Sequence, residues 1–271
     1  MKLPINIVLQ ILLYYWIGIG LKQIHLLTGV SYPTIGYWTS VVRVVCTQIW
    51  NETMPKLGGP GKYVEIDEAV WRRRKYGRGR KKDLLWIFGG VERKEGGGAG
   101  TNFVIIVPDR KKETLIPIIQ ERILAGTTII SDEWKSYNCL KDIGYEHITV
   151  CHKRNFKDPE TGACTNTVEG LWSHLRAFFP KHGVRKTFIA DCLSMWLVQR
   201  NLKPSFADIL QKMIHFIPEE KPIIADEEID FSENEEIPDA DDILHGPRDD
   251  EKEEDSNSVD DGEDASNYSD E

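Results

Sequence analysis

Acidic side chains stand at the ends of two apolar, strand-like stretches of this chain. The run Tyr63–Ile66 is followed directly by Asp67 and Glu68, and the run Thr127–Ile130 ends on Ser131 and Asp132. If the two stretches are neighbouring parallel strands, Asp67 and Asp132 emerge at one edge of a sheet, where open α/β sheets bind ligands. Because neighbouring carboxylates repel unless a cation lies between them, this placement predicts a site for Mg²⁺ or Mn²⁺.

Each aspartate also has a plainer interpretation. Asp67 alone could belong to a turn after a strand, and Asp132 alone could cap a short helix near Trp134. The two aspartates at matching strand ends favour the metal site. Glu68 is expected to be a neighbour of this site rather than a metal ligand.

A third ligand is expected from a helix that begins near Asn166 and ends near Phe179. Asn166 and Glu169 are three residues apart and share a helix face. Arg176 lies two turns beyond Glu169, so that one face could hold both a metal and a DNA phosphate. The alternative is an exposed glutamate with a solvated arginine. The opposite face is an apolar stripe that we interpret as core: Val168, Leu171, Trp172 and Leu175.

A dense run of positive charge follows the first strand. We expect these side chains to contact the DNA backbone, which gives affinity that falls with salt and carries little sequence information. A solvated β-hairpin or a nuclear localisation signal is the alternative interpretation. The residues are Arg72, Arg73, Arg74, Lys75, Arg78, Arg80, Lys81 and Lys82.

The net charge of −9 over 271 residues averages two opposite parts. Residues 219–271 hold 24 Asp and Glu against 3 Lys and Arg, a charge of −21, whereas residues 1–218 carry +12. A basic globular part suggests a polyanionic partner. The acidic tail is nearly free of aromatic residues, so we expect it to be disordered.

Neither the cysteines nor the apolar N-terminus indicates a secreted or membrane protein. The chain has five cysteines and no C-x-x-C pair, which is typical of free thiols in a reducing compartment. The run 4-PINIVLQILLYYWIGIG-20 is short for a membrane span and lacks a cleavage site, so we expect a buried helix and no membrane partner.

The order of expected elements predicts an α/β fold. Residues 1–54 form a helical module, in which Gly29 and a second helix near Pro33 fit either a DNA-reading helix-turn-helix or simple helical packing. Three strands joined by short links should be antiparallel, and two later strands that return through helices should lie parallel to the first. This mixed sheet flanked by helices is the layout of a ribonuclease H-like domain, expected over residues 60–203. A helical extension at 204–218 and the acidic tail at 219–271 would follow it.

Several motifs in this order resemble DDE transposases of the Merlin type, the eukaryotic relatives of a bacterial insertion-sequence group. The resemblance covers about residues 60–202 and lies in VEIDE with RRKYGRGR, WIFGGVER, VPDR, IISDEWKSYN, HKRNFKDPETGACTNTVEGLWSHLR and MWLVQRN. It implies catalytic Asp67, Asp132 and Glu169. Since some relatives use Asn as the third residue, Asn166 stays an alternative, and we prefer Glu169 because an ionised carboxylate binds Mg²⁺ better than an amide does.

The resemblance also implies a function and partners. We expect a nuclear DNA transposase that cleaves and rejoins double-stranded DNA, both transposon ends and target, and that works as a homo-oligomer. Two departures stand out: the chain lacks the cysteines of the N-terminal zinc ribbon found in many bacterial relatives, and the acidic tail lies outside the motif set. The alternatives are a domesticated DNA-binding protein without catalytic activity and, with less support, a host nuclease such as a ribonuclease H.

Overall fold

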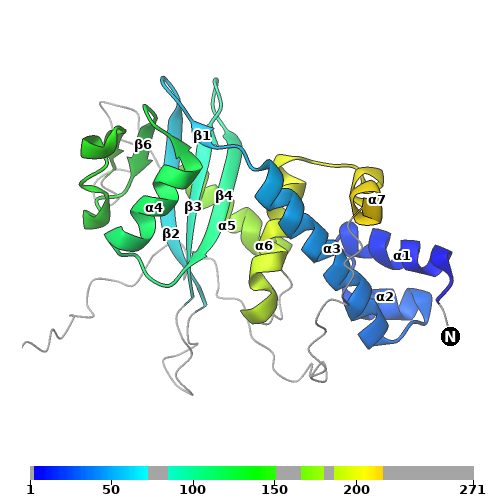
Figure 1. Cartoon of the computed structure of the whole chain (residues 1–271). Coiled ribbons are helices and arrows are strands. Elements are labelled where there is room, and N and C mark those ends of the chain that lie inside the picture. The colour runs from blue at the N-terminus through cyan, green and yellow to red at the C-terminus, as the bar shows by residue number, and fades with distance from the viewer. Residues whose placement is uncertain (1–2, 73–84, 151–165, 180–185, 216–271) are drawn as a thin grey trace, which may run out of the picture.

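A five-stranded mixed sheet forms the centre of the structure, a computed structural model that describes residues 3–72, 85–150, 166–179 and 186–215. The strand order is β4-β3-β2-β6-β7. The first three strands are antiparallel neighbours, and β6 and β7 run parallel to β2 (Figure 1). The strands are β2 (Tyr63–Arg72), β3 (Leu85–Arg93), β4 (Ala99–Val107), β6 (Thr128–Ser131) and β7 (Glu146–Thr149).

The first strand is longer than the sequence indicates. Asp67 was expected where the strand ends, but β2 continues to Arg72. The residues after Asp67 keep pairing with β3, from Glu68 opposite Phe88 to Arg72 opposite Leu85. Asp67 therefore lies inside a strand, whereas Asp132 directly follows the end of β6.

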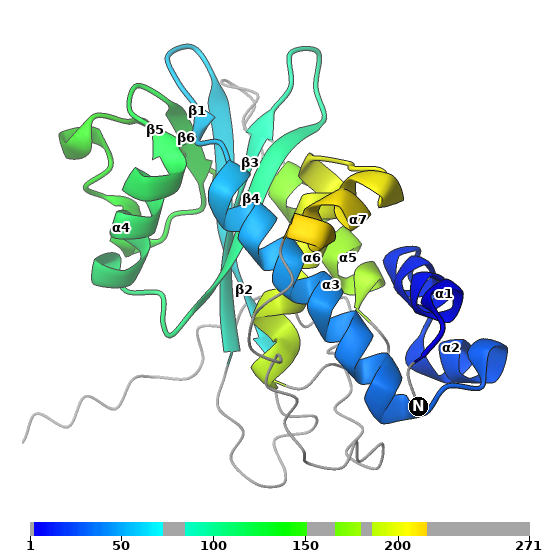
Figure 2. The same cartoon turned by 45° about the vertical axis from the view of Figure 1, so that its right-hand side comes forward.

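Helices cover both faces of the sheet. Figures 1 and 2 show α4 (Lys112–Arg122) on one face, and α5 (Asn166–Phe178) with α6 (Lys186–Asn201) on the other. The helical spacing of apolar residues over 112–124 predicts a helix to residue 124, but α4 ends at Arg122 because Ile123–Leu124 forms β5 and pairs in parallel with β1 (Leu57–Gly58). Two 3₁₀ turns, η2 (Lys135–Tyr137) and η3 (Lys141–Ile143), take the place of the single short helix expected near Trp134.

The N-terminal helices pack beyond α6. They are α1 (Ile5–Trp16), α2 (Leu21–Thr28) and α3 (Tyr32–Thr53), and α7 (Phe206–His215) lies against α3. Pro33 is in the first turn of α3 as expected. Ser31 takes the N-cap position, but its hydroxyl bonds to Thr34 Oγ1 rather than to a backbone amide. Nine of the 22 residues of α3 are buried, and the helix packs along α6, so it shares the core of the sheet.

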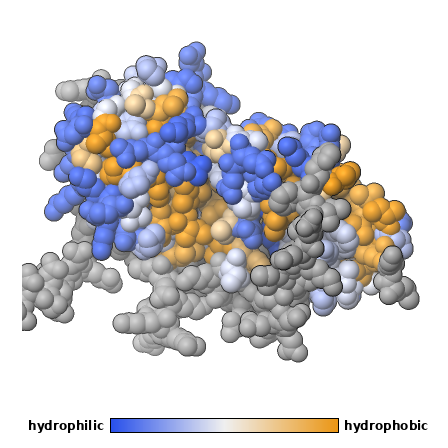
Figure 3. Space-filling view, in the orientation of Figure 1, coloured by the Kyte–Doolittle hydropathy of each residue, from blue (hydrophilic) through white to orange (hydrophobic). Residues whose placement is uncertain are grey.

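The expectation that the apolar N-terminal helix is buried holds for one side only. Val8, Ile11 and Leu12 are buried, but Ile5 and Ile17 are 72% and 61% exposed. Orange atoms gather in Figure 3 at the end of the molecule where α1 and α2 lie. No helix within the described ranges is both long and apolar enough to cross a membrane.

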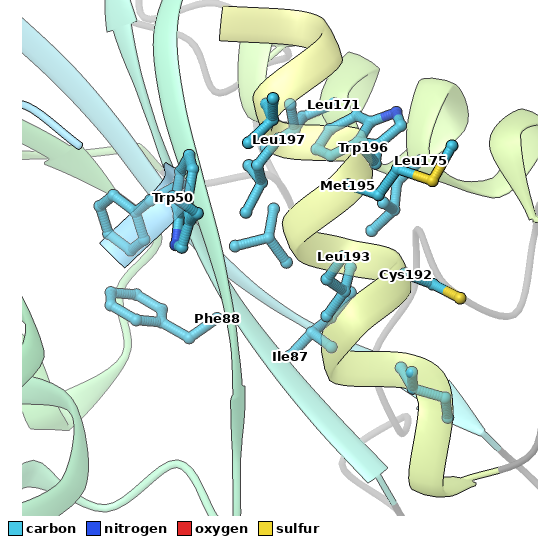
Figure 4. Packing of buried hydrophobic residues seen from close by; sticks show 14 of the residues in the cluster. Trp50, Ile87, Phe88, Leu171, Leu175, Cys192, Leu193, Met195, Trp196 and Leu197 are labelled. Atoms are coloured by element: carbon cyan, nitrogen blue, oxygen red, sulfur yellow. The ribbon is translucent and has the colours of Figure 1, made fainter. Parts of the chain in front are cut away.

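One large hydrophobic cluster joins the sheet to the helices on both sides. Figure 4 shows the part of it where side chains of β3, α5 and α6 meet. The four residues interpreted as the apolar stripe of α5 are all buried in it, which confirms that interpretation. The antiparallel β2-β3-β4 unit, the parallel β6 and β7 and the helices on both faces are those of the expected ribonuclease H-like domain.

Candidate active site

The pairing of β2 with β6 brings the two aspartates level. Tyr63 pairs with Thr128 and Glu65 pairs with Ile130. The pairing ends there, and the same register continued for two more residues would set Asp67 opposite Asp132. Adjacent parallel strands are about 5 Å apart, so these carboxylates are neighbours across the strand boundary.

Asp67 is half-buried and accepts two hydrogen bonds. Its Oδ1 accepts from the backbone N–H of Glu68 at 2.8 Å, and its Oδ2 accepts from Trp172 Nε1 at 2.8 Å. Burial raises the pKa of Asp67 to about 7, the bond from Trp172 opposes this rise, and the charges of Asp132 and Glu169 add to it. Both predicted partners of Asp67 are therefore close enough to influence its ionisation.

Asp132 combines the two roles considered for it. Its Oδ1 accepts a hydrogen bond of 3.1 Å from the backbone N–H of Trp134, as a capping aspartate would. It is half-buried and raises the pKa of both Asp67 and Glu68. The bond to Trp134 thus holds the Asp132 carboxylate beside the other acidic groups. A capping role for Asp132 is therefore compatible with a role in a metal site.

Helix α5 carries the remaining candidates. Glu169 is half-buried in its first turn, Asn166 is its exposed first residue, and Arg176 is half-buried in its last turn. The charge of Glu169 raises the pKa of Asp67.

Sequence reasoning missed the parts played by Glu65 and Trp172. Glu65 is fully buried; its Oε1 accepts from Arg93 Nε at 2.5 Å, and its Oε2 accepts from the backbone N–H groups of Thr167 and Val168 at 2.9 and 3.0 Å. Trp172 was interpreted as core alone, yet its indole N–H binds Asp67. The two-residue alternation of a strand, which puts Glu65 and Asp67 on one face, was the available signal for Glu65.

Glu68 lies on the other face of β2. Its side chain is buried, and its Oε1 has no hydrogen-bond partner. Burial raises its pKa well above the usual range, with Asp67 and Asp132 adding to the rise and Arg110 opposing it. The Arg110 guanidinium stacks between two indole rings, 4.3 Å from the centroid of Trp86 and 4.2 Å from that of Trp134.

These acidic residues fit a hard divalent cation by their chemistry. Carboxylate oxygens are the ligands that Mg²⁺ and Mn²⁺ prefer, and the pKa of Asp67 is raised first by burial and then by the charges of Asp132 and Glu169, both of which a bound cation would offset. Each Asp67 oxygen accepts one hydrogen bond and so keeps a further lone pair. Among the described residues, no group of three or more His, Cys, Asp or Glu is already arranged to hold a metal ion.

The predicted DNA contacts fall largely outside the described residues. Arg72 ends β2, and seven members of the basic run lie in the range that is not described: Arg73, Arg74, Lys75, Arg78, Arg80, Lys81 and Lys82. Their part in binding DNA stays a prediction, as does that of Arg176.

Comparison with known proteins agrees with a transposase class. Residues 58–189 match a family model described as the ISXO2-like transposase domain. An uncharacterized transposase-like protein of Haemophilus influenzae is 23% identical over 117 residues, which span 41% of this chain and 92% of that protein. The chain is thus similar to transposase domains over this range, and neither comparison distinguishes the Merlin type.

Two solved structures are more distant. The catalytic core domain of BIV integrase has a TM-score of 0.33 at 16% identity and covers 56% of this chain and 95% of that chain. A pre-cleavage Mos1 transpososome has a TM-score of 0.31 at 9% identity and covers 72% of this chain and 70% of that chain. The fold assignment rests on the strand order and not on these likenesses.

Proposed function

We propose that the chain is a DNA transposase of the DDE, Merlin-like type, which cleaves DNA strands and joins a freed 3′-hydroxyl to target DNA. The observation that supports the proposal is that the charges of Asp132, after β6, and Glu169, on α5, both add to the raised pKa of Asp67 on β2 of a ribonuclease H-like sheet. The matched transposase domain over residues 58–189 supports the same reaction class.

The three carboxylates would hold Mg²⁺ or Mn²⁺, with Asn166 as the alternative third residue. Bound there, the metal would supply Lewis-acid stabilisation of the attacking and leaving oxygens. The chain's own contribution is to hold these carboxylates in place and to align DNA phosphate with the nucleophile, since phosphoryl transfer depends chiefly on positioning and electrostatics. Water bound to the acidic groups would be the nucleophile for cleavage.

Double-stranded DNA is the proposed partner, gripped by the basic run 72–82 and by Arg176. The charge of +12 on residues 1–218 supports a polyanion. Because a transposase acts on two transposon ends, we also propose a homo-oligomer. A nuclear location follows from the eukaryotic Merlin resemblance and from the possible import function of the same basic run.

Cleavage of DNA tests the reaction, with substrates that carry whatever inverted repeats are found beside the gene. With Mg²⁺, the wild type should nick at the repeat ends, and Asp67→Asn and Asp132→Asn should each lower the rate by at least about 100-fold. Glu133→Gln is the matched control, because Glu133 is the exposed neighbour of Asp132 and should keep wild-type activity. Equal activity in the wild type and both aspartate variants would remove the enzymatic proposal; binding without cleavage would favour the domesticated DNA-binding protein.

The identity of the third residue needs its own pair of variants. Glu169→Gln should abolish cleavage, while Asn166→Ala should leave a measurable rate. The reverse result would assign the third position to Asn166.

A further inference from the structure

The N-terminus of α5 is bonded to a residue far away in the sequence. The first backbone N–H groups of a helix have no partner inside the helix and must find acceptors elsewhere. Here Thr167 and Val168 donate to Glu65 Oε2, which lies 102 residues before Thr167 on β2. A carboxylate is the favoured acceptor at this positive end of a helix. Arg93 on β3 binds the other oxygen and fixes the direction of the carboxylate.

A second bond joins the same helix to the same strand. Trp172 is 1% exposed and donates its indole N–H to Asp67 Oδ2. The residue paired with Asp67 on β3 is Gly89. A Cβ at Gly89 would lie 2.5 Å from Cη2 of the indole, so β3 has no side chain where the ring must lie. The position of the Trp172 ring is therefore fixed, and its indole N–H donates to Asp67, a predicted metal ligand.

The two bonds have matching spacings on the helix and the strand. Glu65 and Asp67 are two residues apart on one face of β2, about 6.6 Å along the strand. Val168 and Trp172 are four residues apart on α5, about 6 Å along the helix axis. Both bonds can thus form only in one placement of α5, since a slide by one helical turn of about 5.4 Å would leave the buried Glu65 without its amide donors. Glu169 lies between the two bonded positions.

We propose that Glu65 and Trp172 are positioning residues, which fix α5 on β2 at two points and thereby hold Glu169 beside Asp67 in the geometry that binds the metal. This inference rests on the proposed metal site. Neither residue is a metal ligand in it: Glu65 acts through the backbone of α5, and Trp172 acts through Asp67 and Gly89.

Mn²⁺ titration of the full-length protein, followed by electron paramagnetic resonance, tests the inference without DNA. Glu65→Gln and Trp172→Phe should each weaken Mn²⁺ binding by about tenfold or more, because each removes a bond that fixes the ligands. Gly89→Ala should weaken Mn²⁺ binding as Trp172→Phe does. The added methyl group displaces the indole ring, so that its N–H, although still present, no longer reaches Asp67. Hydrogen exchange should be faster at the amides of Thr167 and Val168 in Glu65→Gln alone.

Trp50→Phe is the matched control. Trp50 is a buried indole on α3 in the same hydrophobic cluster. It should lower the melting temperature as much as Trp172→Phe does, while Mn²⁺ affinity stays at the wild-type value. Wild-type Mn²⁺ affinity in both Glu65→Gln and Trp172→Phe would overturn the inference. It would also fall if Trp50→Phe lost affinity equally, or if the wild type bound no Mn²⁺ through Asp67.

DNA cleavage by the same proteins separates this inference from the proposed function. A wild type that binds Mn²⁺ through Asp67 but cleaves no DNA would sink the function alone, and the titration would still decide the positioning roles. Cleavage at the wild-type rate and metal requirement in both variants would sink the positioning roles and leave the function standing.

Discussion

Asp67 is held between opposing influences on its charge. Partial burial and the charges of Asp132 and Glu169 favour its neutral form, and the N–H groups of Trp172 and Glu68 favour its ionised form. The first set prevails, so that its pKa rises to about 7. An ionised Asp67 therefore costs folding free energy when no cation is bound.

This cost predicts an unusual pH dependence of stability in the presence of a chelator. The folded-state pKa of about 7 lies above the unfolded value of about 3.9, so the native state binds more protons between these values and loses stability as pH rises through that window. Asp67→Asn should match the wild type near pH 4 and exceed its free energy of unfolding by roughly 4 kcal/mol at pH 8. Urea unfolding at both pH values measures the difference.

The control for this experiment is Asp142→Asn, an exposed carboxylate whose loss should leave the pH profile unchanged. Adding Mg²⁺ at pH 8 should stabilise the wild type and not Asp67→Asn, because only the wild type keeps the ligand. Parallel pH profiles for wild type and Asp67→Asn would contradict the assigned environment.

At the scale of single residues, the sequence indicated the candidate acidic residues but not the residues that hold them in place. Asp67 and Asp132 could be selected because acidic residues after apolar runs are conspicuous, and Glu169 because of its place on a helix face and the motif resemblance. Strand alternation puts Glu65 on the face of Asp67, but its role and that of Trp172 could not be predicted, because a glutamate bonded to a helix N-terminus and an indole packed over a glycine depend on how α5 docks on the sheet. The docking of α5 is set by long-range packing, which the local spacing of residues does not reveal.

At the scale of elements, prediction succeeded where periodicity was strong and failed at boundaries. The strand order and the start of α5 at Asn166 follow from pattern and connection rules. The end of α4 does not, because pairing of Ile123–Leu124 with β1 overrides the local preference for helix. The length of β2 was also underestimated, since its continuation depends on β3 as partner.

The contact between β4 and the end of α6 yields a prediction at this scale. Asn201 accepts hydrogen bonds from the backbone and side-chain N–H groups of Asn102 at 3.1 and 2.9 Å, and it donates to the Asn102 carbonyl at 2.8 Å. Asn102 is fully buried. Asn201→Ala would leave these buried groups unpaired and should lower the free energy of unfolding by about 2–4 kcal/mol.

Chemical denaturation measures this loss, with Asn138→Ala as the control at an exposed asparagine. The control should change the free energy of unfolding by less than about 0.5 kcal/mol. A loss for Asn201→Ala no greater than that of the control would mean that this junction adds nothing to the attachment of α6.

At the scale of the whole molecule, the N-terminal helices and the sheet share one hydrophobic cluster through α3 and α6. A helix-turn-helix role for residues 1–54 stays a prediction, and any DNA read there would be held close to the sheet by this packing. Charge is divided unevenly along the chain: residues 1–218 carry +12 and residues 219–271 carry −21. The acidic residues of 219–271 would therefore compete with DNA for the basic residues of the same chain.

Deleting residues 219–271 should therefore raise affinity for non-specific DNA. At about 50 mM salt, where charges interact over a longer range, we expect affinity to rise about tenfold or more, and the difference should shrink toward 300 mM as salt screens it. Fluorescence anisotropy with a random duplex measures both. A full-length chain with the tail's Asp and Glu changed to Asn and Gln separates charge from length, and it should bind as the deletion does. Unchanged affinity in both at low salt would exclude screening by the tail, and a gain in the deletion alone would assign the effect to the tail's bulk rather than to its charge.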